Sequence, residues 1–135
     1  MMNTPFAKVA ILAAREARKT ADPVMAWEHA SIKVFGKGTS QQLKGCPKNT
    51  FLGLCEEGII KGIPKGKYTR SVKNKTYALT AVRILNKEKH ISSAALWKEV
   101  MIALNENSGK QHNGQMDVVL ALADKYLACH ILTKP

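Results

Sequence analysis

Two helix-start signals of the same kind stand near the beginning of the chain. Thr4 precedes Pro5, and Asp22 precedes Pro23. Each pair joins a side chain that can accept from a free backbone N–H to a proline at the first helical position. Apolar residues recur at helical spacing after both pairs. The pattern predicts helices over 5–19 and 23–35, the second ended by Gly36, and it favours a helical fold.

The rest of the chain shows further helical patterns between loops. Helices are predicted over 47–57, 72–87, 93–104 and 114–128, with Pro47 opening the first and Ser71, Ser92 or Ser93, and Asn113 capping the others. The fold class is therefore expected to be an all-α, single-domain orthogonal bundle of five to six helices spanning residues 1–135. Residues 1–4 and 129–135 are expected to be flexible ends. The predicted core consists of Trp27, Phe35, Phe51, Leu54, Leu79, Val82, Leu96, Trp97, Met116, Val119 and Leu120.

Composition limits the classes of protein that the chain can belong to. Its 135 residues suffice for a core without disulfides or metal, and 45% hydrophobic residues argue against disorder. The three cysteines, Cys46, Cys55 and Cys129, lack the spacing of a disulfide framework, and no secretion signal is visible. No stretch reaches the ~18 apolar residues of a membrane span. We expect a cytoplasmic protein with reduced thiols and no membrane partner.

Positive charge is concentrated in residues 33–75. This segment holds ten of the 21 Lys and Arg residues but only two of the ten acids, Glu56 and Glu57, so it carries +8 of the formal +11. Such an imbalance costs self-repulsion and indicates an anionic partner. Aromatic residues are only 6% of the chain, so a broad platform for base stacking is not expected.

The start of the predicted 72–87 helix is the first candidate site. Free N–H groups at a helix start favour an anion, whereas the bases around this one repel each other unless an anion binds. The candidate residues for nucleic acid or another polyanion are Lys61, Lys65, Lys67, Tyr68, Arg70, Ser71, Lys73 and Lys75. The alternative is a solvated basic face with an ordinary Ser71 cap, part of its charge balanced by Glu56 and Glu57.

A helix-turn-helix is a related hypothesis for helices 47–57 and 72–87. Arg70, Lys73, Asn74 and Lys75 would then enter the major groove, with Asn74 reading adenine. The connection argues against it, because the usual turn has ~3–4 residues and Gly58 to Arg70 spans thirteen.

Four sequence blocks carry a family resemblance. They are GCPKNTFLGLCEEG at 45–58, KGIPKGKYTRS at 61–71, LWKEV at 96–100 and HNGQMDVVL at 112–120. With these blocks the chain resembles a family of small, uncharacterised bacterial proteins, and it is similar to products of mobile gene cassettes carried in integrons. The resemblance covers about residues 5–128 and implies a helical fold in a bacterial cytoplasm. It implies no activity and no catalytic residue.

The remaining candidates are weaker. Trp97, His112 and Gln115 could line a pocket, although Asn113 as a helix cap and Asp117 near a helix start explain most of that segment structurally. No pair of Cys or His residues has the spacing of a zinc site, so neither metal nor cofactor is expected.

Three function classes follow. The leading hypothesis is a non-enzymatic module that binds a polyanion such as nucleic acid. The alternative is a protein–protein adaptor, either homodimeric or meeting an acidic partner. A small enzyme that uses Cys46 or His112, with Asp117 to orient the base, is the third.

Overall fold

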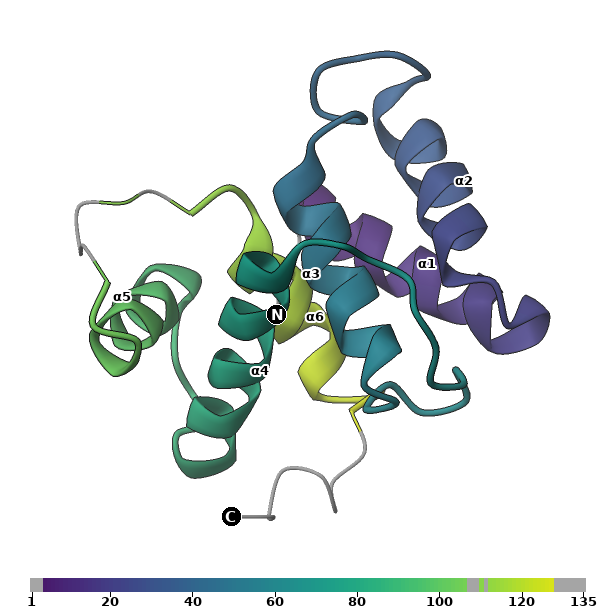
Figure 1. The fold of residues 1–135 in the computed structure, drawn as a ribbon. Coiled ribbons are helices and arrows are strands. Elements are labelled where there is room, and N and C mark those ends of the chain that lie inside the picture. Colours follow the sequence, from purple (N-terminus) through teal and green to yellow (C-terminus); the bar gives the residue numbers. More distant parts are fainter. Residues whose placement is uncertain (1–3, 107–109, 111, 128–135) are drawn as a thin grey trace.

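The fold is built of α-helices. The computed structural model describes residues 4–106, 110 and 112–127. Within these residues the helices are α1 (Pro5–Thr20), α2 (Pro23–Phe35), α3 (Gly45–Glu56), α4 (Val72–Lys87), α5 (Ser93–Ala103) and α6 (Gln115–Ala123). The β-structure of this part is one isolated antiparallel bridge between Ile60 and Leu127. The prediction of an all-α bundle is confirmed (Figure 1).

Side-chain caps begin four of the helices as predicted. Thr4 accepts a hydrogen bond from the backbone of α1 over 3.4 Å, and Asp22 accepts one from α2 over 3.1 Å. Ser71 and Ser92 cap α4 and α5 in the same way, over 3.3 and 3.2 Å. The predicted starts at residues 5, 23, 72 and 93 are therefore confirmed, and so are the ends at 35 and 87.

The predicted bounds of two helices were wrong. α3 begins at Gly45 instead of Pro47, and α6 ends at Ala123 instead of residue 128, which lies outside the described residues. Gly114, and not Asn113, is the N-cap of α6, with φ of 90°. A β-carbon at Gly114 would lie 2.7 Å from Cδ2 of Phe6, so both the backbone angle and the neighbouring ring require glycine there.

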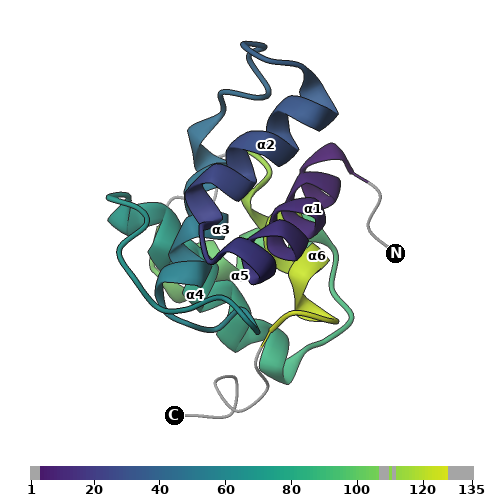
Figure 2. The same ribbon diagram turned by 90° about the vertical axis from the view of Figure 1, so that its right-hand side faces the viewer.

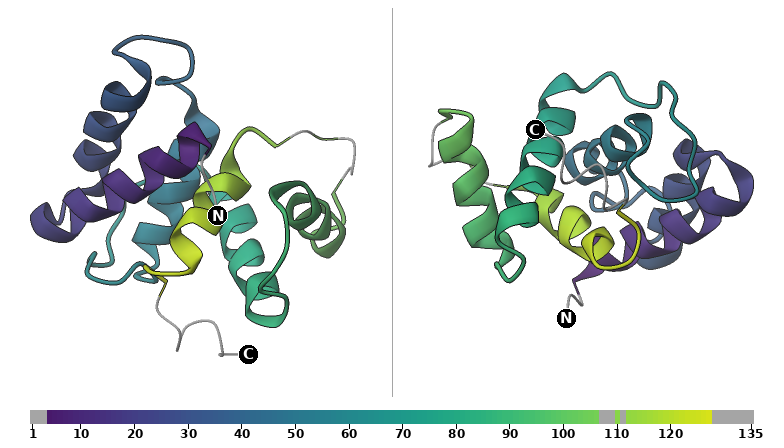
Figure 3. Two further views of the ribbon diagram at one scale, coloured as in Figure 1. Left: turned by 180° about the vertical axis from the view of Figure 1, so that it is seen from behind. Right: turned by 90° about the horizontal axis from the view of Figure 1, so that it is seen from below.

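The helix α6 lies at the centre of the bundle. It contacts α1, α3, α4 and α5, whereas α2 packs mainly on α1. Figures 1 and 3 show α5 on the far side of α4, with α1 and α2 on the opposite side of the molecule. Figure 2 looks onto α1 and α2 and shows α6 next to α1. The helix α6 thus joins both sides of the fold.

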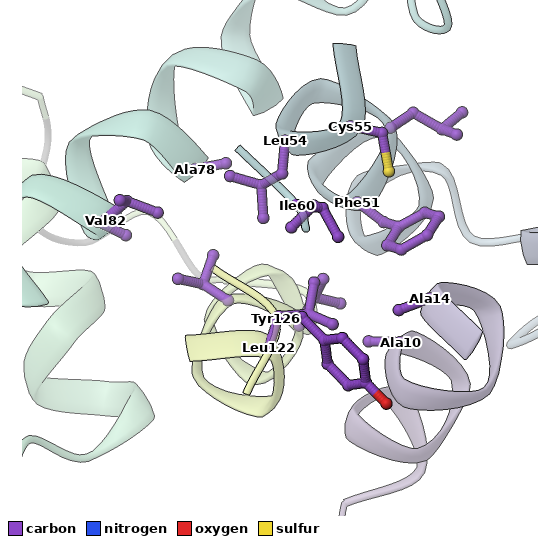
Figure 4. Close-up of a cluster of buried hydrophobic side chains, with 14 of the residues drawn as sticks. Ala10, Ala14, Phe51, Leu54, Cys55, Ile60, Ala78, Val82, Leu122 and Tyr126 are labelled. Carbon is purple, nitrogen blue, oxygen red and sulfur yellow. The ribbon is translucent and has the colours of Figure 1, made fainter. Parts of the chain in front are cut away.

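One hydrophobic core unites the helices. Figure 4 shows Leu54 of α3, Val82 of α4 and Leu122 of α6 converging with Ala10 and Ala14 of α1. Most of the predicted core is buried, and the half-buried exceptions are Phe35, Leu79 and Leu120. The fully buried face of α6 consists instead of Met116, Val118, Val119 and Leu122.

The expectation of flexible ends falls outside the described residues, apart from Thr4, which caps α1. Among the described helices, none combines the length and the apolar character that crossing a bilayer requires.

Candidate functional site

Residues 58–71, which we call the connector, join α3 to α4 and run back alongside α3 (Figure 1). The Oε1 atom of Glu56 accepts hydrogen bonds from the backbone N–H groups of Tyr68 and Thr69, at 2.8 and 3.1 Å. The Thr69 hydroxyl donates to the Asn49 Oδ1 atom at 2.8 Å. The C-terminal half of the connector is therefore fixed to α3.

The first half of the connector is anchored to the segment after α6. Ile60 forms its bridge with Leu127, and the backbone N–H of Lys61 donates to the Tyr126 carbonyl oxygen at 2.7 Å. Ile60 and Ile63 are buried in the core. Both halves are thus tied to the helical body, and the lysine side chains between them point to solvent.

An ion-pair network joins the end of α3 to the first turn of α4. Lys75 Nζ lies 2.7 Å from Glu56 Oε2 and 2.6 Å from Glu57 Oε2. The bond from Lys75, with those from Thr69 and Tyr68, lowers the pKa of Glu56 from 4.5 to about 2, while both carboxylates raise the pKa of Lys75. The charge balance by Glu56 and Glu57 considered from the sequence is present. Lys75 is therefore engaged within the protein.

The stretch from residue 58 to residue 87 holds eight Lys and Arg residues and no Asp or Glu. Lys75 is doubly paired, and Lys73 Nζ lies 3.9 Å from Glu106 Oε1. The other six bases are exposed and have no carboxylate within 4.0 Å among the described residues. They are Lys61, Lys65, Lys67, Arg70, Arg83 and Lys87.

Arg83 and Lys87 were missed by the sequence reasoning. The basic segment defined from the sequence ends at residue 75, because Lys and Arg become less frequent after it. The absence of acids continues to residue 87, and this signal could have extended the candidate surface along α4.

A hollow of about 420 Å³ lies between the end of α3 and the last residues of the connector. Glu56, Lys67, Tyr68, Thr69 and Arg70 line it. Its one carboxylate, that of Glu56, already accepts from two backbone N–H groups and from Lys75. The charges left to meet a ligand there are those of Lys67 and Arg70.

Tyr68 is turned back onto the connector. Its hydroxyl donates to the Pro64 carbonyl oxygen at 2.7 Å. Its ring lies against Gly66, where a β-carbon would come within 2.7 Å of the Tyr68 Cζ atom. The ring is therefore held by its own loop and is only partly accessible.

Comparison with known proteins gives a family. The model described as "Family of unknown function (DUF6979)" matches residues 2–128, which is almost the whole chain. The chain belongs to this family. No curated protein and no solved structure matches it.

In this DUF6979 protein, the three residues of the second candidate pocket are only partly brought together. The rings of Trp97 and His112 lie 5.9 Å apart, and Trp97 Nε1 donates to the Lys110 carbonyl oxygen at 2.7 Å. Gln115 is buried, and its amide donates to Asn74 Oδ1 at 3.4 Å. Gln115 therefore faces α4.

Asn74 would read adenine in the helix-turn-helix hypothesis, but its side chain already forms hydrogen bonds within the protein. Its side-chain amide donates to the Ser71 hydroxyl oxygen at 3.0 Å and accepts from Gln115. It is half-buried, so its hydrogen bonds support the start of α4.

The cysteines Cys46 and Cys55 belong to α3, and Asp117 belongs to α6. Cys55 is buried, and burial strongly raises the pKa of its thiol, so it is a small core residue. Cys46 is half-buried in the first turn of α3. Asp117 accepts a 2.5 Å hydrogen bond from the Ser93 hydroxyl. Within the described residues, no three His, Cys, Asp or Glu side chains are grouped to hold a metal ion.

Proposed function

We propose that this protein binds a polyanion such as nucleic acid through Lys61, Lys65, Lys67 and Arg70, which we call the connector bases, with Lys73 beside them. The observation that carries the proposal is that the four connector bases are exposed without a carboxylate partner among the described residues. Figure 1 shows the connector passing over α3 to the start of α4.

The fixed connector favours such binding. Ordering a loop on binding costs free energy. The hydrogen bonds of Glu56 and Asn49 hold the connector in place before any ligand binds, so this cost is small here. Arg70 can grip a phosphate with two parallel N–H groups, and Lys67 supplies a point charge beside it at the hollow. Ser71 already accepts from the Asn74 N–H, so only the remaining N–H groups of the first turn of α4 can add to the attraction.

The test is fluorescence anisotropy with labelled nucleic acid over a salt series. The parent should bind with an affinity whose logarithm falls linearly against the logarithm of salt concentration. Lys67→Glu/Arg70→Glu should lower the affinity by about ten-fold or more and reduce the slope by about two. Lys8→Glu/Lys33→Glu changes the net charge equally at exposed positions of α1 and α2, and should bind nearly as the parent does.

Two outcomes contradict the proposal. One is a parent that fails to bind even at low salt. The other is an equal loss for both variants, which would trace the attraction to net charge rather than to the connector bases.

A protein–protein adaptor, homodimeric or paired with an acidic protein, is the second candidate. The exposed apolar side chains of Val72 in α4 and Ile102 in α5, 77% and 63% exposed, favour it. A stable dimer on a sizing column, together with an absence of nucleic-acid binding, would select this candidate over the first.

The proposed setting is a reducing bacterial cytoplasm. The free thiols of Cys46 and Cys55 support it. The resemblance to integron cassette products supports a bacterial source.

A further inference from the structure

We infer that the polyanion is a duplex nucleic acid that lies along the exposed face of α4 as well as the connector. This inference rests on the proposed function and adds both the class of polymer and a second contact element. The residues that it adds are Arg83 and Lys87, which the sequence did not single out.

The exposed face of α4 becomes basic toward the end of the helix, where Arg83 and Lys87 follow Val72 and Thr76. Val72, Thr76, Arg83 and Lys87 are all exposed, and at about 100° per residue they fall within about 60° of one another around the helix. The helix has no Asp or Glu, and it spans 16 residues, or about 24 Å. Arg83 and Lys87 have no carboxylate within 4.0 Å in the described part of the chain. They therefore add two exposed cations near the end of α4 to the connector bases that precede its start.

The bases are spread out rather than convergent. A small phosphate compound needs several donors directed at a few oxygen atoms, and at the hollow only Lys67 and Arg70 supply positive charge. A duplex instead carries one negative charge per about 1.7 Å of its axis. Cations that precede α4 and stand again near the end of this helix of ~24 Å can neutralise several phosphates of such a polymer at once.

The aromatic residues favour a duplex over a single strand. The chain has two Trp, three Tyr and three Phe residues, and the structure describes all eight. Six are buried, while Phe35 and Tyr68 are half-buried, and Tyr68 is held by Pro64 and Gly66. Single-strand binders stack unpaired bases on accessible rings. A duplex needs no such ring, because it presents its phosphates outward with its bases already stacked.

The test compares polymers and variants over a salt series that begins at a low concentration. The probes are a DNA duplex of about two helical turns (~20 base pairs), the RNA duplex of the same sequence, and each single strand. The parent should bind at least one duplex about ten-fold more tightly than the single strands, and the two duplex arms show which source is preferred. Arg83→Glu/Lys87→Glu should weaken duplex binding by about ten-fold and lower the salt slope by about two.

Controls separate this inference from the proposed function. Arg83→Gln/Lys87→Gln should show a smaller loss in the same direction, and Lys8→Glu/Lys33→Glu should bind as the parent does. Circular dichroism of each variant checks that it is folded. Single strands bound as tightly as duplexes, or an α4 variant that binds like the control, would overturn the inference. If Lys67→Glu/Arg70→Glu still lost affinity, the proposed function would stand; binding to none of the probes would overturn both.

Discussion

A β-carbon on Gly53 would lie 2.9 Å from the α-carbon of Lys75, so α3 and α4 meet backbone to backbone at this point. Because glycine has no side chain, it permits this close packing of the two helices. The structure shows a consequence beyond packing. The crossing brings Lys75 to the end of α3, where Glu56 also holds the connector.

Gly53→Ala should lower the free energy of unfolding by about 1–3 kcal/mol, because the added methyl group has no room between the two backbones. Alanine's better helix propensity offsets this by only about 1 kcal/mol. Urea unfolding followed by circular dichroism measures the change.

Gly45→Ala is the matched control, because a β-carbon there would meet only the Asn49 side-chain amide, at 3.7 Å. This variant should be as stable as the parent or slightly more so. Equal stabilities of the two variants would contradict the close crossing.

Glu56→Gln should lower the free energy of unfolding at neutral pH by about 1–3 kcal/mol, because a charged acceptor and its ion pair with Lys75 are lost. The folded-state pKa of Glu56, about 2, lies below its ordinary 4.5. The stabilisation from this carboxylate is therefore complete above the ordinary pKa and is lost as the pH falls through the folded-state value.

The difference between parent and Glu56→Gln should consequently shrink from about pH 5 to about pH 2. Thermal or urea unfolding at a series of pH values measures it, and taking the difference removes the titration of the other carboxylates. A difference that stays constant over this range would mean that Glu56 is not held ionised by Lys75 and the connector.

Tyr68→Leu should leave the affinity for nucleic acid within about two-fold of the parent, because the Tyr68 ring is not free to stack on a base. The ring is held by Pro64 and Gly66, whereas the connector is fixed through backbone N–H groups that leucine retains. Loss of a stacked base would cost about 1–3 kcal/mol instead. Anisotropy titration of the variant distinguishes the two.

The thiols should react in a fixed order. In a Cys129→Ser background, an aromatic disulfide reagent should modify Cys46 in the native protein, while Cys55 should react only on unfolding, because it is buried with a raised pKa. Counting released thiolate before and after adding denaturant checks this. An unusually fast Cys46 would revive the enzyme hypothesis, and an early reaction of Cys55 would contradict its burial.

Local signals in the sequence accounted for most helix starts. Thr4, Asp22 and Ser71 each act within one turn of chain, so their roles depend little on the rest of the fold. The position of α6 could not be predicted as well. It is apolar on nearly all sides because four helices surround it, so its pattern has no polar face from which to judge orientation.

The candidate site was predicted only as a set of bases. Composition indicated that charge gathers in this region, but it could not tell that Lys75 is bound by Glu56 and Glu57 while Lys67 and Arg70 are not. That distinction arises from the Gly53 crossing and the path of the connector, which depend on residues far apart in the sequence. Arg83 and Lys87 required the exposed face of α4 to be known.

The central place of α6 also sets the order in which the molecule can form. During synthesis α1 to α5 emerge before α6, which packs between them. The bridge of Ile60 likewise cannot form until Leu127 has been synthesised. Domains in which early segments depend on late ones close through contacts of long sequence separation. Native packing around α6 must therefore follow translation of residues 115–127, and until then the apolar faces that α6 covers remain open to water or to a chaperone.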